Sequence, residues 1–214
     1  MLVVLAFGLE VFAYDVVSID AGRGPVDLLV PDGNTPADPA PLLMLLHGYS
    51  GNGDGVEAYM NFSSIVDEFG FLYAHPDGTA DAVGNQFWNA TDACCNFFSV
   101  PIDDSGYLRG LIDLIESSYA VSEVYIAGHS NGGFMSYRMA CDHSDRITAI
   151  ASLAGATFLD PAQCGSPDPV HVLQIHGTND GTILYDGGCL GSNCYPSAVA
   201  SVEQWATFAG CDLD

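Results

Sequence analysis

A serine within residues 128–132 has the surroundings of a catalytic nucleophile. The segment reads Gly-His-Ser-Asn-Gly, which places Ser130 between two glycines. An apolar run precedes it at residues 123–127, and a stretch with helical character follows at residues 133–140. A strand, a tight turn and a helix in this order expose a serine hydroxyl at a strained turn above the helix N-terminus. The glycines are needed because side chains there would collide with the neighbouring strand and helix. The motif therefore predicts that Ser130 attacks an acyl carbonyl.

A carboxylate that supports this serine is expected later in the chain. A serine hydroxyl is a weak nucleophile and needs a histidine to take its proton, and that histidine needs an acid to orient it. After such a turn the usual chain order is serine, acid, histidine, with the acid just after a later strand. Asp180 follows the apolar run at residues 170–176, so we predict that it is the acid, with Asp186 as the alternative. Either carboxylate would otherwise cap a turn.

Two backbone N–H groups are expected to bind the negative charge that develops on the substrate oxygen. The first belongs to Asn131, the residue after the nucleophile, as in other sites of this type. The second should come from the loop after the first buried strand, residues 42–47, where Tyr49 is the favoured donor. Gly48 would let the backbone approach the substrate closely. The alternative interpretation of this loop is an ordinary glycine-rich turn.

The general base is the difficulty, since no histidine follows Asp180. His47 and His176 end predicted strands, but both precede the acid in the chain. His129 lies inside the turn, where its side chain is expected to pack. The remaining histidines are expected at a helix C-terminus or at core and edge positions: His75, His143 and His171. We therefore expect that the chain is truncated at its C-terminus and that the base lies beyond it. The odd number of cysteines agrees, because Cys211 would then lack its partner.

The order of elements predicts an α/β fold. Apolar strand-like runs alternate with helical segments, a pattern that produces a mostly parallel sheet flanked by helices. With the serine turn, this favours an α/β-hydrolase fold that lacks its last strand and helix. Residues 14–214 are expected to form a single domain that begins with a hairpin at residues 14–30. The expected strands cover residues 42–47, 71–75, 123–127, 147–153 and 170–176, and the expected helices cover residues 56–69, 103–119, 133–140 and 196–208.

Composition excludes some classes of partner. The 214-residue chain has no lysine, and its four arginines face 27 acidic residues, giving a formal net charge of -23. Such a surface repels nucleic acid and anionic lipid, so we expect neither nucleic acid nor membrane as a partner. The acidic excess fits either a salty habitat or a compositional bias of the lineage. The sequence does not predict the oligomeric state.

The cysteines and the N-terminus point to secretion. None of the seven cysteines has the spacing of a metal site, so we expect no metal and no cofactor. Disulfides are the remaining interpretation, and they imply an oxidising compartment. Residues 2–9 are apolar, and residues 11–13 resemble a signal-peptide cleavage site. We interpret residues 1–13 as a signal peptide remnant; the alternative is a buried first strand.

Several motifs together resemble one family. The chain resembles the secreted polyhydroxybutyrate depolymerase-like and feruloyl or acetyl-xylan esterase group of α/β-hydrolases. The resemblance implies a serine esterase with Ser130 as nucleophile and Asp180 as acid, acting on hydroxyalkanoate polyesters or on acetyl or feruloyl esters of polysaccharides. The alternative is a catalytically incomplete hydrolase-fold protein that lacks the histidine. The matching segments are residues 46–48, 76–78, Trp88 with residues 94–95, residues 103–107, 128–133 and 176–180.

The resemblance also implies one specific disulfide, and the sequence suggests a second disulfide and a binding residue. It suggests that Cys94 or Cys95 pairs with Cys141, since adjacent cysteines rarely bond to each other. Cys189 and Cys194 would close a local loop, and Cys164 has no assigned partner. Trp88, in the long loop at residues 79–101, is predicted to line the acyl pocket, with a core position as the alternative. Which ester is the substrate stays open.

Overall fold

The computed structural model describes residues 14–212, so the predicted signal peptide remnant lies outside the described residues. The strands are β1 (Asp15–Ile19), β2 (Val26–Val30), β3 (Ala40–Leu46), β4 (Leu72–Ala74), β5 (Thr79–Ala80), β6 (Gln86–Phe87), β7 (Val121–His129), β8 (Ala149–Leu153), β9 (His171–Ile175), β10 (Gly188–Leu190) and β11 (Asn193–Tyr195). The helices are α1 (Gly53–Met60), α2 (Val66–Phe69), α3 (Asp104–Glu116), α4 (Asn131–Asp142) and α5 (Ala198–Phe208), with short 3-10 helices η1 (Phe62–Ile65) and η2 (Pro161–Cys164).

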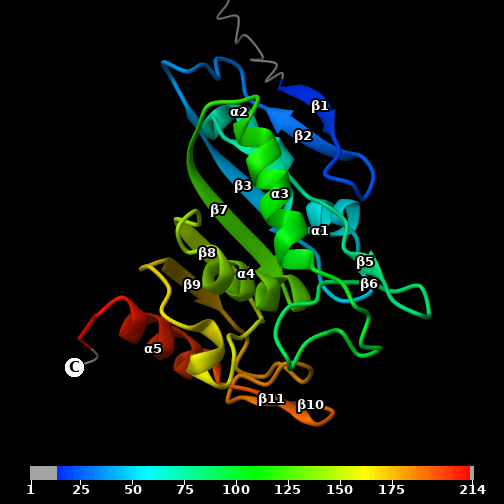
Figure 1. Ribbon diagram of the computed structural model, residues 1–214, viewed down its shortest axis with the longest axis vertical. Helices are drawn as coiled ribbons and strands as arrows, with labels where there is room; N and C mark the ends of the chain where they lie inside the picture. The colour runs from blue at the N-terminus through cyan, green and yellow to red at the C-terminus, as the bar shows by residue number, and fades with distance from the viewer. Residues whose placement is uncertain (1–13, 213–214) are drawn as a thin grey trace, which may run out of the picture.

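A seven-stranded sheet forms the centre of the molecule (Figure 1). Its strand order is β1-β2-β4-β3-β7-β8-β9, and every pair from β4 to β9 is parallel. The predicted N-terminal hairpin is β1 and β2, which pair antiparallel and join the sheet through β4. The predicted α/β fold with a mostly parallel sheet is therefore confirmed. Within the described residues, β9 is an edge strand, and its Leu173 and Ile175 are about half exposed.

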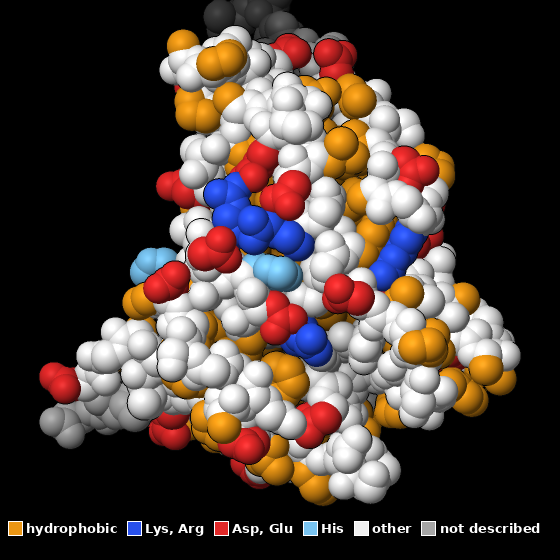
Figure 2. Space-filling view, in the orientation of Figure 1, with side chains coloured by type: hydrophobic (Ala, Val, Ile, Leu, Met, Phe, Trp, Pro, Cys, Tyr) orange, Lys and Arg blue, Asp and Glu red, His pale blue; other side chains and the backbone are white. Residues whose placement is uncertain are grey.

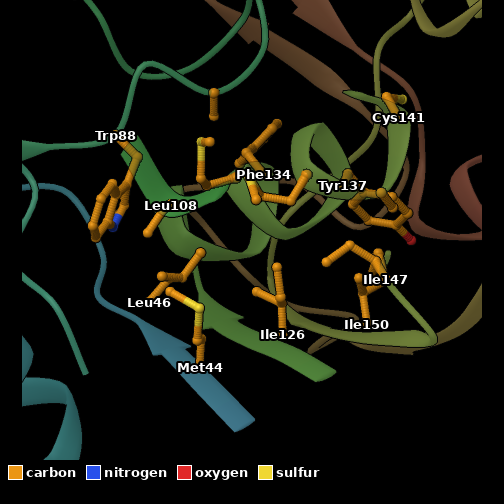
Figure 3. Close-up of a cluster of buried hydrophobic side chains, with 14 of the residues drawn as sticks. Met44, Leu46, Trp88, Leu108, Ile126, Phe134, Tyr137, Cys141, Ile147 and Ile150 are labelled. Carbon is orange, nitrogen blue, oxygen red and sulfur yellow. The ribbon is translucent and has the colours of Figure 1, made fainter. Parts of the chain in front are cut away.

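Helices cover both faces of the sheet because each face carries its own apolar side chains. On one face α3 and α4 pack over β3, β7 and β8 (Figures 1 and 3). On the other face α1, η1 and α2 pack against a smaller cluster that includes Leu45 and Tyr73. Burial of this kind supplies most of the stability of helices as short as these. Figure 3 shows the larger cluster, with Met44, Leu46, Trp88, Leu108, Ile126, Phe134, Tyr137, Cys141, Ile147 and Ile150 labelled.

Most of the predicted elements are present, with shifts at their ends. The helix expected at residues 56–69 is in fact three shorter segments. It is interrupted at Asn61, which adopts a left-handed conformation with φ of 56° and ends α1. Asparagine tolerates this conformation better than most residues, and the helical pattern of apolar side chains does not reveal it. The helix expected from Asp103 begins as predicted, because the Asp103 side chain accepts a hydrogen bond from the Gly106 N–H as an N-cap.

The predicted disulfide pairing was partly wrong. Cys141 pairs with Cys164, because the C-terminal end of α4 lies beside η2 and brings the two Cα atoms to 5.0 Å. Cys94 and Cys95 bond to each other, so neither is available to Cys141. The predicted pair Cys189–Cys194 is confirmed and joins β10 to β11. Three disulfides therefore involve six cysteines, and Cys211 is exposed and free.

The few arginines lie among carboxylates over α3 and α4 (Figure 2). Arg109 pairs with Asp113 and Asp145, and Arg146 pairs with Glu116. Two of these pairs, Arg109–Asp145 and Arg146–Glu116, connect α3 with the loop that follows α4. Exposed pairs of this kind contribute little individually, about 0–1 kcal/mol each. Among the helices of residues 14–212, none combines the length and apolar character needed to cross a membrane.

Candidate active site

Ser130 occupies a strained turn between β7 and α4. Its φ is 54° and its ψ is -116°, a conformation that side chains rarely adopt. The flanking glycines permit the turn by close approach. A Cβ atom at Gly128 would lie 2.2 Å from the backbone of Gly132, and one at Gly132 would lie 2.0 Å from the Leu46 carbonyl oxygen. The predicted need for glycine at both positions is therefore confirmed.

Ser130 lines a cavity of about 410 Å³. Tyr49 lines it on the side of the loop after β3, and Val56 and Tyr59 line it from α1. The Tyr59 ring is 67% exposed and lies 5.9 Å from the His129 ring, measured between centroids. The cavity therefore combines a nucleophile with an aromatic and aliphatic wall, a composition typical of sites for small organic groups.

Both residues predicted to supply the oxyanion donors lie near Ser130, because Tyr49 lines the same cavity and Asn131 directly follows the serine. Asn131 is the first residue of α4, where backbone N–H groups have no partner within the helix. Within the described residues neither the Asn131 nor the Tyr49 backbone N–H donates a hydrogen bond to another protein group. The loop that carries Tyr49 is fixed by two bonds, from Ser50 N to Gln86 O at 2.8 Å and from Gly51 N to Gly48 O at 3.0 Å.

The side chain of Asn131 is fully buried and fixes the end of the turn at residues 128–132, the nucleophile elbow. Its Oδ1 accepts a hydrogen bond from the Trp88 N–H at 2.7 Å, and its Nδ2 donates to the Trp88 carbonyl at 2.9 Å. Its Nδ2 also lies 3.6 Å from the Cys94 Sγ. These contacts attach the loop between β6 and α3 to the residue after the nucleophile, so the loop and the elbow form one rigid unit.

Trp88 does not line the cavity, which corrects the sequence-based prediction. Its side chain is fully buried, its Nε1 donates to the His47 carbonyl at 3.1 Å, and its ring packs 5.1 Å from the His47 ring. The polar composition of the loop at residues 79–101 did not indicate that the Trp88 side chain is buried in the core. The wall residues Val56 and Tyr59 were missed instead, although their spacing of three residues on a helix places them on one face.

Asp180 lies in the turn after β9, as expected of the acid. Its Oδ1 accepts hydrogen bonds from Thr182 N at 2.8 Å and Ile183 N at 3.0 Å, which fix the carboxylate as a turn cap. Its Oδ2 accepts no hydrogen bond within the described residues and lies 3.8 Å from His176 Nε2. One oxygen is thus anchored while the other is free. The alternative, Asp186, is exposed.

None of the six histidines, all within the described residues, forms a hydrogen bond with the Ser130 hydroxyl. His47 is fully buried, with its Nε2 accepting from Gly78 N and its Nδ1 donating to the Gly48 carbonyl, each at 2.8 Å. His176 donates from Nε2 to the Ile183 carbonyl at 2.7 Å, and its Nδ1 lies 3.1 Å from Gln174 Nε2. Both nitrogens of each ring are therefore occupied, and these histidines position the surrounding loops.

The pH dependence of stability follows from His47. Burial is the main cause that lowers the pKa of His47 from 6.5, although the Gly48 carbonyl and the charges of Asp77 and Asp104 oppose it. The unfolded chain therefore binds a proton that the folded chain rejects, so stability falls as pH decreases through and below about 6.5. We expect the loss of melting temperature between about pH 7.5 and pH 5.5 to be smaller in His47→Gln than in the unsubstituted protein.

His171→Gln is the matched control, because this histidine is exposed on the edge strand β9. It should keep the pH dependence of the unsubstituted protein. Equal pH dependence of the melting temperature in the His47 and His171 variants would contradict the assignment of this dependence to His47. Burial also lowers the pKa of His129. Part of the pH dependence of stability should therefore persist in His47→Gln.

The described residues contain no group of three or more His, Cys, Asp or Glu side chains arranged to hold a metal ion.

Comparison with known proteins decides the family. No family model matches the chain. Probable feruloyl esterase C of Aspergillus niger is 30% identical over 200 residues, which cover 86% of this chain and 70% of that protein. The chain belongs to the feruloyl esterase family. Feruloyl esterase C of Emericella nidulans is a second relative of this family, 32% identical over 173 residues, which cover 79% of this chain and 60% of that protein.

Solved structures confirm the fold of this feruloyl esterase family member. Acetyl xylan esterase from Aspergillus awamori superimposes with a TM-score of 0.62 at 16% identity, covering 92% of this chain and 81% of that chain. The predicted α/β-hydrolase fold and the resemblance to feruloyl and acetyl-xylan esterases are both confirmed. The chain spans 42%, 34% and 60% of the length of three curated relatives that it matches.

Proposed function

We propose that the protein is a serine carboxylic ester hydrolase with Ser130 as its nucleophile. The observation that carries the proposal is the strained turn at Ser130, which borders a cavity near the Tyr49 and Asn131 backbone N–H groups; within the described residues these two groups donate to no protein atom. Relatives named feruloyl esterase, acetylxylan esterase and poly(3-hydroxybutyrate) depolymerase are in keeping with it. All three names describe cleavage of a carboxylic ester by water.

In the proposed reaction, the Ser130 Oγ forms a bond to the ester carbonyl carbon while a histidine removes its proton. The carbonyl oxygen becomes negatively charged and accepts hydrogen bonds from the Tyr49 and Asn131 N–H groups. The tetrahedral intermediate then expels the alcohol, which receives the proton from the histidine and leaves an acyl-enzyme. Water repeats the sequence, releasing the acid and restoring the serine. Removing one oxyanion donor typically costs about 100- to 1000-fold in kcat.

We propose that none of the six described histidines, as they lie in this structure, acts as the general base of this reaction. Three of the described histidines have ring nitrogens bonded to other groups: His47, His143 and His176. The free Oδ2 of Asp180 would orient the incoming imidazole. The other candidate function, a hydrolase-fold protein that is catalytically incomplete, is favoured by the same lack of a histidine at Ser130.

Acylation of Ser130 tests this function. Incubation with p-nitrophenyl acetate, with imidazole added as a substitute base, should add one acetyl group to the peptide that contains Ser130. Peptide mass spectrometry would detect it. No acetylated serine in that peptide, with the label instead spread over surface groups, would contradict the proposed nucleophile.

The wall of the cavity favours an acyl group with an aromatic ring. Tyr59 presents an exposed ring beside the serine, and an aromatic acyl group would pack against it. We expect Tyr59→Ala to raise KM for methyl ferulate by about tenfold, equivalent to roughly 1.4 kcal/mol, and to change KM for an acetyl ester little. Phe69→Ala is a control, because Phe69 is equally exposed but lies outside the cavity. Equal changes in KM for both esters in Tyr59→Ala would exclude packing of the aromatic acyl group against Tyr59.

The disulfides support secretion as part of the proposal. Cys141–Cys164 and Cys189–Cys194 persist where the environment is oxidising. We therefore propose that the protein acts outside the cytosol, on esters of polysaccharides or on polyesters. Mass spectrometry of protein recovered from culture medium, without reduction, should show both linkages. Free thiols at all four positions would count against secretion.

A further inference from the structure

β5 and β6 form a short antiparallel hairpin outside the seven-stranded sheet (Figure 1). The two proposed oxyanion donors are the N–H groups of Tyr49, in the loop after β3, and of Asn131, the first residue of α4. The hairpin and the residue that follows it, Trp88, form hydrogen bonds with both of these segments. One short element is thus attached to two donors that lie far apart in the sequence.

The Tyr49 side chain is held by a carboxylate of this hairpin. Its hydroxyl donates to Asp81 Oδ2 at 2.6 Å and accepts from Asn85 Nδ2 at 3.1 Å. Asp81 has only 9% of its surface exposed, and its Oδ1 accepts from the Val83 and Asn85 N–H groups, each at 2.9 Å. One oxygen of the carboxylate therefore fixes the hairpin turn, and the other fixes Tyr49. Hydrogen bonds to a carboxylate are roughly twice as strong as those between neutral groups.

The backbone next to Tyr49 needs such restraint. Ser50 has a φ of 61°, in the left-handed region that residues other than glycine rarely adopt. Conformations of this kind persist only where the surrounding contacts hold them in place. The Ser50 N–H donates to the Gln86 carbonyl of β6 at 2.8 Å. The same hairpin thus holds the side chain of Tyr49 and the peptide group that follows it.

The other end of the hairpin is attached to the second donor. Directly after β6, the Trp88 N–H donates to Asn131 Oδ1 at 2.7 Å, and the Trp88 carbonyl accepts from Asn131 Nδ2 at 2.9 Å. Both residues are fully buried, so this attachment is part of the core. The Tyr49–Asp81 bond instead joins two side chains beside the core. It is therefore the contact at which substitutions can test the arrangement.

We propose that Asp81 is a positioning residue: through the Tyr49 hydroxyl it holds the Tyr49 N–H group where the carbonyl oxygen of the ester becomes negatively charged. This inference rests on the proposed ester hydrolase function and adds to it a residue that does not touch the substrate. Asp81 does not line the cavity at Ser130, so its effect on the reaction passes through Tyr49. A displacement of about 1 Å in a group that acts on the transition state can slow a reaction by about 100-fold.

The rate at which p-nitrophenyl acetate acetylates Ser130, at a fixed imidazole concentration, tests the inference. Because the oxyanion develops only toward the transition state, Asp81→Ala should lower the maximal rate by about tenfold or more. It should change the ester concentration at half-maximal rate by less than about twofold. Tyr49→Phe removes only the hydroxyl and should cause a similar loss. The double variant should lose no more than either single variant, because the two groups act as a unit.

Two further variants separate positioning from a general effect on the hairpin. Asp20→Ala is the matched control, because Asp20 Oδ1 also accepts from two N–H groups of a hairpin turn, those of Gly22 and Gly24, and Asp20 does not line the Ser130 cavity. It should keep the rate within about twofold. Asp81→Asn should keep it within about threefold, since its amide oxygen can cap the same turn while its nitrogen donates to the Tyr49 hydroxyl.

The outcomes separate the inference from the proposed function. Equal rates in the Asp81→Ala and Asp20→Ala variants, or additive losses in the double variant, would overturn the positioning role and leave acetylation of Ser130 unaffected. No acetylation of Ser130 in the unsubstituted protein would overturn the proposed function, and the positioning role with it. Circular dichroism would show which variants are folded. Where Asp81→Ala is unfolded, the milder Tyr49→Phe decides, and an unchanged rate in that variant would overturn the inference.

Discussion

Replacing Ser130 by alanine is expected to lower imidazole-assisted ester hydrolysis by about a thousandfold or more. The reason is that the strained turn presents a single hydroxyl to the cavity, and alanine leaves the N–H groups of Tyr49 and Asn131 without an oxyanion to bind. The measurement is the rate of p-nitrophenol release from p-nitrophenyl acetate, corrected for the reaction of imidazole alone.

A serine control accompanies this variant. Ser122→Ala alters an exposed hydroxyl near the start of the same strand, β7, and should leave the rate unchanged. Rates for Ser130→Ala within a factor of about two of the unsubstituted protein would contradict its role as nucleophile.

Loss of Arg23 is expected to destabilise the fold by about 3–5 kcal/mol. The Asp104 side chain is fully buried and accepts hydrogen bonds from Arg23, from Thr79 Oγ1 and from the Asn89 N–H. Arg23→Ala would leave a buried carboxylate without its cation. The free energy of unfolding, measured by urea denaturation, should show the loss.

Two further variants show whether the burial of Asp104 causes the loss of stability in Arg23→Ala. Arg109→Ala removes an arginine whose partners Asp113 and Asp145 are more than half exposed, so it should cost about 1 kcal/mol or less. Asp104→Asn in the Arg23→Ala background should recover part of the stability, because the buried charge is gone. Similar losses in Arg23→Ala and Arg109→Ala would show that the Asp104 contact is not a buried ion pair of the expected kind.

Much of the fold was predictable from local patterns. The continuous apolar runs indicated strands buried on both faces, and the glycines around Ser130 indicated the elbow because only a close backbone approach needs them. The helix expected from residue 103 likewise begins there through a local contact, since the Asp103 side chain caps a backbone group three residues away. These features depend on neighbours along the chain, and sequence patterns report such neighbours directly.

Contacts between distant segments were not predictable in the same way. The pairing of Cys141 with Cys164 depends on where η2 packs, and the inward direction of Trp88 depends on the His47 loop and on Asn131. Tyr59 was missed for a similar reason, because its place at the cavity depends on how α1 packs beside the elbow. Sequence spacing predicted Asp180 and Tyr49 at the correct edge of the sheet, while their roles as acid and oxyanion donor stay predictions.

The most direct test of the proposed ester hydrolase is Ser130-dependent hydrolysis of p-nitrophenyl acetate with and without imidazole. The rate for Ser130→Ala is subtracted from the rate for the unsubstituted 214-residue protein at each imidazole concentration. We expect little Ser130-dependent rate without imidazole and an increase as imidazole supplies the base. High Ser130-dependent activity without imidazole would contradict the proposal that the described histidines do not include the base. The absence of Ser130-dependent hydrolysis at every imidazole concentration would contradict the ester hydrolase itself.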